Sequence, residues 1–306
     1  MHAALLTALL FALTAVCANQ SSRLLGAGRA NAWRLLVALV LLGTWAHLFG
    51  QGFSGSAVHW FLLAGGIGFG LGGWCMFQAL RRVGSTLSLL TVECAAAIFA
   101  AAIGWIVLGA SLRGIEVVLA GLILVGVVVG MSPGPIPNLR RAQVLAGCGL
   151  ALLAAFFQAT SFNISRHAFN LLQVGGESPE FFSAAYQRLA GGFMVAAFIY
   201  LLTLGTRSMR QVRPKSPFSS PLPAPAWVVM NALFGPILGV TCVLWAISLV
   251  ENPGLVQAVA ATATLLTVPF AYFLEGARPR RSYYFGCVIA LGATAGLLLV
   301  RAGGSA

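Results

Sequence analysis

Long apolar runs separated by short polar breaks dominate this sequence of 306 residues. Hydrophobic residues make up 59% of the chain, charged residues make up only 8%, and the mean hydropathy is +0.92. A water-soluble fold of this composition would lack the polar surface needed to cover itself, whereas a lipid-facing exterior removes that requirement. We therefore predict an all-α integral membrane protein.

The apolar runs can be counted as spans because a helix needs about 20 apolar residues to cross a hydrocarbon core of about 30 Å. The breaks between the runs are clusters of Arg, Ser, Gly and Pro, which are typical of helix ends and loops. The ten predicted transmembrane helices cover residues 3–18, 32–49, 58–79, 85–108, 114–131, 143–163, 181–204, 225–248, 254–274 and 283–301. This layout leaves no room for a folded domain outside the membrane.

Charge and cysteine usage exclude several function classes. The net charge is +12, but the basic residues fall between apolar runs and form no stripe, so we predict no nucleic-acid partner. Aspartate is absent and the six glutamates are scattered, which leaves little for a catalytic acid pair. The cysteines and histidines show no metal-binding spacing. We predict no catalytic residues, no metal site and no cofactor, and hence no enzyme.

An internal repeat divides the chain. Residues 68–109 align with residues 235–276 at a constant offset of 167, with nine identical pairs and no gap. We predict a first five-helix repeat over 1–131, a linker over 132–142 and a second repeat over 143–306. Because five is odd, the two repeats must lie in the membrane with opposite orientations. Inverted repeats of this kind recur in secondary transporters, which bind substrate near the midplane between the repeats.

The order of these features resembles the EamA-like permeases of the drug/metabolite transporter (DMT) superfamily. The resemblance rests on the five-plus-five layout, on an arginine that opens the second span of each half, and on a helix-ending stretch in the second half. The residues concerned are Arg34 in Asn31-Ala-Trp-Arg34, Arg188 in Ala185-Tyr-Gln-Arg188, and Phe273-Leu-Glu-Gly276 followed by Gly286. The resemblance implies a secondary transporter or exporter of small metabolites.

Glu93 lies in the middle of the fourth predicted span, where a charged side chain costs about 2.5–3.5 kcal/mol. We predict that it faces a central cavity as a protonatable or cation-binding group, because burial disfavours the charged form and allows proton exchange between access states. A structural clamp to a neighbouring helix is the alternative. The equivalent position in the second half is Ala260, and Gln257, one turn earlier, is predicted to face the same cavity and to hydrogen-bond substrate. A clamp between helices is the alternative for Gln257.

Further polar and aromatic side chains are candidates for substrate binding. Trp74 and Gln78 are four residues apart and share a helix face, and Trp245 occupies the position equivalent to Gln78. Such a set would suit an amphipathic or cationic organic substrate, with lipid-facing tryptophans as the alternative. Gln158 and Asn163 in the sixth span are also candidates, for which helix packing is the alternative.

Small residues and prolines give packing signals. Glycines spaced four apart, as at Gly126 and Gly130 or Gly292 and Gly296, predict close helix contacts, and so does the glycine series at residues 66–72. Pro236 and Pro269 interrupt the eighth and ninth spans, where freed carbonyl groups could bind substrate or a kink could form.

These observations favour a multi-pass secondary transporter that works by alternating access, coupled to protons, for a small metabolite or organic cation. A bacterial inner membrane is the expected location, with lipid as surroundings and a monomer or homodimer as the assembly. The alternative is a lipid-linked flippase or scramblase on the same scaffold. That function would require arginines along a groove, and the sequence disfavours it because the spans contain almost no arginine.

The distribution of basic residues predicts that both termini lie outside the cell. If the chain started in the cytoplasm, fourteen of its eighteen basic residues would lie in or beside external loops, against the positive-inside rule. The family resemblance implies the opposite orientation. On the charge count, a reporter that is active only in the cytoplasm should give no signal when fused at Ala306. A strong signal from that fusion would overturn the assignment.

Overall fold

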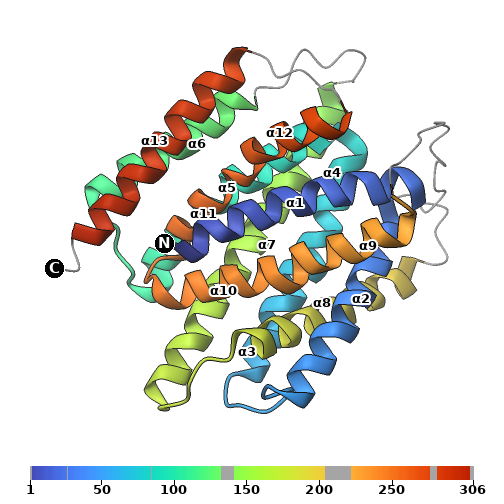
Figure 1. Cartoon of the computed structure of the whole chain (residues 1–306). Coiled ribbons are helices and arrows are strands. Elements are labelled where there is room, and N and C mark those ends of the chain that lie inside the picture. Colours follow the sequence, from blue (N-terminus) through green and yellow to red (C-terminus); the bar gives the residue numbers. More distant parts are fainter. Residues whose placement is uncertain are drawn as a thin grey trace.

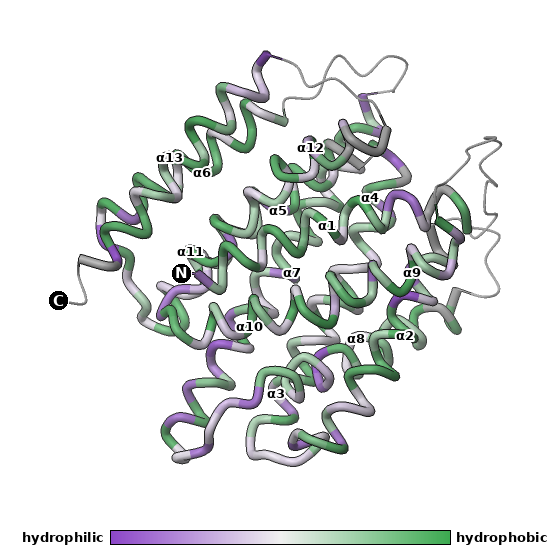
Figure 2. The backbone as a smooth tube through the Cα atoms, viewed as in Figure 1, coloured by the Kyte–Doolittle hydropathy of each residue, from purple (hydrophilic) through white to green (hydrophobic). Residues whose placement is uncertain are grey.

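The protein is a bundle of helices, seen here in a computed structural model that describes residues 2–25, 27–83, 85–131, 141–203, 222–275 and 281–303 (Figure 1). All secondary structure in these ranges is helical, which agrees with the predicted all-α class. Apolar residues dominate the helices, and hydrophilic residues gather mainly towards helix ends and connections (Figure 2).

The first half of the chain forms five helical stretches, and the third of these contains a π-helical segment. They are α1 (His2–Leu25), α2 (Ala27–Leu48), α3 (Val58–Gly65) continuing through η1 (Gly66–Gly72) into α4 (Gly73–Val83), α5 (Ser85–Leu108) and α6 (Gly114–Gly130). Of the predicted linker, only residues 141 and 142 are described, and they begin α7.

The second half follows the same order. Its elements are α7 (Arg141–Val174), α8 (Phe181–Thr203), α9 (Ala224–Ala232) continuing through η3 (Leu233–Gly239) into α10 (Val240–Leu249), α11 (Pro253–Ala260), α12 (Ala263–Glu275) and α13 (Arg281–Gly303). Each of the ten predicted spans therefore falls on one helix or on one run of consecutive helices.

Eight of these helical stretches are long and apolar enough to cross a membrane by length and composition. The remaining two are α6, a shorter apolar helix, and α8, whose first third carries the polar residues Ser183, Gln187 and Arg188. Ten spans in two inverted repeats therefore stay a prediction, while a multi-pass integral membrane protein is established.

α7 is longer than its predicted span, which ends at residue 163. Its 34 residues extend about 50 Å, well beyond the hydrocarbon thickness. Ala168, Phe169 and Leu172 in the extra turns are buried in the main core, and the ring of Phe169 lies 5.1 Å from that of Phe61 on α3. Packing against α3 therefore extends the helix where the apolar run alone ends.

The two halves exchange their first helices. α1 packs against α9, η3, α10, α11 and α12 of the second half, and α7 packs against α3, η1, α4 and α5 of the first. Likewise α2 contacts α9 and η3, as α8 contacts α3 and η1. Swapping the halves reproduces these contacts, although the α1–α2 and α8–α10 contacts are not matched to the same extent by α7–α8 and α2–α4.

The π-helical segments reproduce the sequence offset of 167. η1 begins at Gly66 and η3 at Leu233, and they end at Gly72 and Gly239. Pro236 lies inside η3, whereas η1 contains no proline, so proline alone does not create this geometry. π-helical turns inside α-helices are rare and frequently mark functional sites.

Two pairs of equivalent helices run antiparallel. In the α6–α13 pair, Glu116 contacts Arg301 at one end, and Gly130 contacts Gly286 towards the other. In the second pair, α5 lies against α11, with Ala101 beside Gly254 and Glu93 beside Gln257. Because these helices occupy equivalent places in the two halves, their opposite directions agree with an inverted arrangement.

Glycines set the approach of α6 to α13. A Cβ atom on Gly286 would lie 2.4 Å from the backbone of Gly126 and Gly130, so the helices touch through their main chains. The predicted role of Gly126 and Gly130 in close packing agrees with this contact. A Cβ on Gly292 would meet nothing within 4 Å, so the predicted small-residue pattern does not bring helices together there.

We expect Gly286→Ala to destabilise the protein by about 1–3 kcal/mol, because the added methyl group forces α6 and α13 apart. Thermal unfolding of the detergent-purified protein measures the loss. Gly292→Ala on the same helix is the matched control and should unfold like the parent. Equal unfolding temperatures for the two variants would contradict the close-contact interpretation.

Candidate functional site

Glu93 and Gln257, which we predicted to face the same cavity, contact each other in the structure. The Nε2 atom of Gln257 donates a hydrogen bond of 2.7 Å to Oε2 of Glu93, across the contact between α5 and α11. Gln257 is fully buried, whereas Glu93 is half-buried. The side chain of Gln158 on α7 also approaches the Glu93 carboxyl group closely enough to interact with it. Three helices from both halves therefore converge on one acid.

This cluster combines an acid with amide groups in an apolar setting. A hydrogen bond to an ionised carboxylate is shorter and stronger than one between neutral groups, and low polarity around it strengthens the attraction further. The Oε1 atom of Gln257 is buried without a hydrogen-bond partner among the described residues. The cluster can therefore hold or release a proton at Glu93 and accept one further hydrogen bond at Gln257.

The helix that contacts Glu93 is broken about one turn beyond Gln257. α11 ends at Ala260, the position equivalent to Glu93, and the chain passes through a turn at Ala261 and Thr262 before α12 begins. The hydroxyl groups of Thr262 and Thr264 donate to backbone carbonyls three residues earlier. Discontinuous helices near the midplane are characteristic of transporter binding sites. Pro269, which we expected to interrupt this span, lies inside α12 instead.

Asn163 links helices. It is buried, and its Nδ2 donates to the carbonyl oxygens of Ala100 on α5 and Ala159 on its own helix, at 3.1 and 3.0 Å. Its Oδ1 and the amide of Asn252 both lie beside Gly104, where an added Cβ would contact each at 3.1 Å. These contacts support the packing alternative for Asn163, and its predicted role with substrate stays a prediction.

Gln78, Trp74 and Trp245 form no hydrogen bond with Glu93 or Gln257 among the described residues. Arg82 Nη1 donates to the Gln78 side chain at 3.0 Å and to its carbonyl oxygen at 2.8 Å, near the end of α4. Trp74 is 43% exposed and Trp245 is 42% exposed, so both lie outside the packed core. That these three residues bind substrate, and that Glu93 lines a central chamber, stay predictions.

Arg188 was noted in the sequence only as a mark of family resemblance, yet it is one of the most buried side chains, with 2% exposure. Its guanidinium carbon lies 5.6 Å from the Phe69 ring and 5.4 Å from the Phe162 ring, and its Nη2 donates to Ser161 Oγ at 2.8 Å. In the sequence, the sign of this burial is the position of Arg188 inside an otherwise apolar run. We expected almost no arginine in the spans, and the structure shows that Arg188, one of the few, is fully enclosed.

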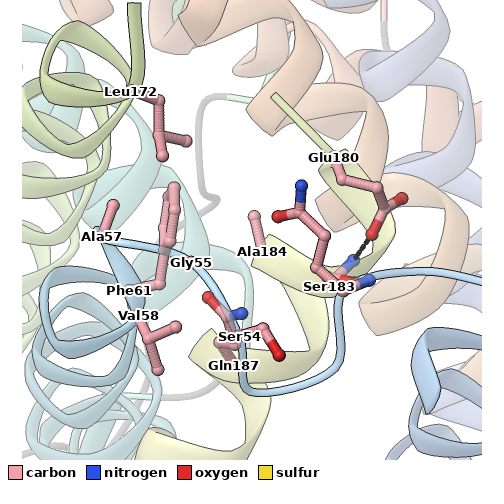
Figure 3. A pocket seen from close by; sticks show the side chains of 11 residues that line it. Ser54, Gly55, Ala57, Val58, Phe61, Leu172, Glu180, Ser183, Ala184 and Gln187 are labelled. Atoms are coloured by element: carbon pink, nitrogen blue, oxygen red, sulfur yellow. Dashed lines mark hydrogen bonds between the residues drawn. The ribbon is translucent and has the colours of Figure 1, made fainter. Parts of the chain in front are cut away.

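A small pocket lies where the loop between α2 and α3 covers the start of α8. Figure 3 shows Phe61 and Leu172 across it from Glu180 and Ser183. The polar groups are already paired: Glu180 accepts from the Ser183 amide, Ser183 Oγ accepts from the backbone amide of residue 51, and Gln187 donates to the carbonyl oxygen of residue 52. These bonds anchor the loop to α8.

Fold and composition together define a multi-pass integral membrane protein. The chain belongs to the EamA-like transporter family, whose model matches residues 1–131 and 145–299. This confirms the predicted membership in the DMT superfamily. Members of the family are membrane transporters and in general are not enzymes.

A solved structure shares the fold. It is described only as the crystal structure of a protein, and the match covers 97% of this chain and 96% of that one, with a TM-score of 0.67 and 19% sequence identity. At that identity the likeness concerns the fold alone. No curated protein matches the sequence.

We expect Gln257→Leu to lower the free energy of unfolding by about 0.5–2 kcal/mol, because the Glu93 carboxyl group loses its interhelical donor. In a Glu93→Gln background the same change should cost less. Unfolding of the four proteins in detergent, analysed as a double-mutant cycle, measures the coupling. Gln173→Leu, at an exposed amide on α7, is the control. Strict additivity of the two changes would show that the charge on Glu93 adds nothing to the hydrogen bond.

Proposed function

We propose that this protein is a secondary transporter that moves a small metabolite or organic cation by alternating access, coupled to protons through Glu93. The observation that carries the proposal is the hydrogen bond between Glu93 on α5 and Gln257 on α11. This bond joins the two halves of the chain through Glu93, an acid whose charge is costly to bury in an apolar interior. We further propose that the protein lies in a bacterial inner membrane as a monomer or homodimer.

The arrangement of the halves supports alternating access. Equivalent helices run antiparallel in the α6–α13 and α5–α11 pairs, and the exchange of α1 and α7 interlocks the halves. Two structurally related bundles can rock against each other around a central site, so that the site opens first to one side and then to the other. The Glu93–Gln257 contact lies on the surface along which such a motion would occur.

Asymmetry within the repeat supports proton coupling at one position. Glu93 has Ala260 as its equivalent, and Gln257 has Leu90, so the polar pair occurs once in the molecule. An ionised Glu93 holds the Gln257 donor strongly, and a protonated one holds it more weakly. Protonation would therefore loosen the contact between α5 and α11, and substrate would compete for the same groups.

The alternative of a lipid-linked flippase has one observation in its favour, the buried cation at Arg188. A flippase needs that cation in a groove open to lipid, because the headgroup must travel while its tails stay in the bilayer. Arg188 is only 2% exposed and lies between two phenylalanine rings. The enclosed position favours a transporter over a flippase.

Purified protein in liposomes with an imposed proton gradient tests the proposal. We expect uptake or release of at least one compound from a panel of amino acids, sugars and organic cations, and we expect Glu93→Gln to reduce gradient-driven flux to that of empty liposomes. Glu177→Gln, which removes a carboxylate from the loop between α7 and α8, should retain the parental flux.

Gradient-driven flux that Glu93→Gln leaves unchanged would end the coupling assignment while leaving transport in place. Movement of fluorescent phospholipid without movement of any solute would favour the flippase instead.

A further inference from the structure

Arg188 is a buried cation with unused hydrogen-bond donors. Ser161 Oγ accepts from Nη2, but Nε and Nη1 have no partner although both are buried. Within the described ranges, no acidic side chain forms an ion pair with Arg188, whereas Arg301 pairs with Glu116 at 2.7 Å. The structure thus encloses a positive charge and leaves two of its three nitrogens without an acceptor.

Such an arrangement is costly unless an anion completes it. A guanidinium group stays charged under all ordinary conditions, so it cannot escape burial by losing a proton. The faces of Phe69 and Phe162 attract the cation through their ring electrons, but they accept no conventional hydrogen bond from the edge of the guanidinium. Buried donors without acceptors are rare in native proteins and call for an explanation.

We propose that Arg188 binds the carboxylate of a substrate that carries one negative charge and an apolar body. The proposal deepens the transport function proposed above and rests on it, because a bound carboxylate is a substrate only if the protein transports it. The binding cage consists of Arg188, Ser161, Phe69 and Phe162, and it holds one cation only. One cation between aromatic rings suits a monocarboxylate better than a phosphate, which carries more charge and is more strongly hydrated.

The cage also spans the two halves. Phe69 belongs to η1 in the first half, whereas Arg188, Ser161 and Phe162 belong to α8 and α7 in the second. Ser161 Oγ additionally donates to the carbonyl oxygen of Ala64 on α3 at 2.6 Å. An anion held here would contact residues from both halves of the sequence, so its binding would favour the conformation in which these residues are packed together.

Comparison of the halves shows that the cage is specific to one of them. Gly68 in η1 lies against Ser161, and its equivalent Gly235 in η3 lies against Thr14, so the hydroxyl contact is repeated. Arg34 is the eighth residue of α2 as Arg188 is of α8, but Arg34 donates to Asn31 on its own helix at 2.7 Å. Among the described residues, the ring contacts that enclose Arg188 are not repeated at Arg34, although Arg34 Nε is also buried without a partner there.

Equilibrium binding to the detergent-purified full chain tests the site without requiring transport. The probes are benzoate, phenylacetate and hexanoate, with benzamide as a neutral match for benzoate and inorganic phosphate as a different anion, all at constant ionic strength. Saturable stabilisation against thermal unfolding reports binding. We expect at least one monocarboxylate to stabilise the protein, and benzamide and phosphate to have no saturable effect.

Arg188→Gln should weaken binding of that carboxylate by at least about tenfold, and Arg188→Lys should weaken it less. Arg301→Gln, which removes an arginine from α13, should bind like the parent. If the Arg188 variants do not fold, Phe69→Leu and the comparison of benzoate with benzamide on the parent protein still decide the matter.

No saturable stabilisation by any of the three carboxylates would overturn the proposal, as would equal effects of benzoate and benzamide or tighter binding of phosphate. Carboxylate binding in a protein that transports nothing would leave the site standing and remove the transport function. Transport of other solutes without carboxylate binding would do the reverse.

Discussion

Every backbone amide and carbonyl group of this chain that lies in lipid must find its hydrogen-bond partner within the protein, and the rest of the structure depends on that constraint. This constraint makes the described secondary structure wholly helical. The polar groups that still need partners inside the membrane are then those of the side chains. The helices then associate without help from the hydrophobic effect, since lipid is as apolar as they are. Close main-chain contact at Gly126, Gly130 and Gly286 is one solution, and hydrogen bonds across helices are the other.

The polar side chains that cross between helices divide into two kinds. Asn163 and Asn252 donate to backbone carbonyls and hold α5 in place, which is a structural use of a polar group. Asn163 Oδ1, Gln257 Oε1 and two nitrogens of Arg188 all lack a partner among the described residues. The Glu93–Gln257 pair and the Arg188 cage differ from Asn163 because each centres on an ionisable group. Unsatisfied groups in an apolar interior are expensive and persist where function requires them.

A repeated scaffold with non-repeated chemistry explains how both sites arise. Three features recur in the two halves: the π-helical segments, the packing of the first helix against the other half, and the glycine–hydroxyl contacts. Both halves therefore share one scaffold. The residue equivalent to Glu93 in the second half is Ala260, and the ring contacts of Arg188 are not repeated at Arg34 among the described residues. Side-chain differences on a common frame give a transporter two chemically distinct halves around one interface.

The sequence by itself determined the membrane class, the helical stretches, the offset of 167 and the family, because apolar periodicity and repeat spacing are local properties of the chain. It also led to Glu93 and Gln257, since a charge or an amide inside an apolar run is visible without coordinates. Only the tertiary structure decided that those two side chains bond to each other and that α11 ends about one turn beyond Gln257. It also decided that α7 extends along α3. At the α6–α13 contact it placed Gly286 and not Gly292. The enclosure of Arg188 belongs to the same group, because burial depends on residues such as Phe69 and Phe162 that are distant in sequence and meet it only when the helices pack.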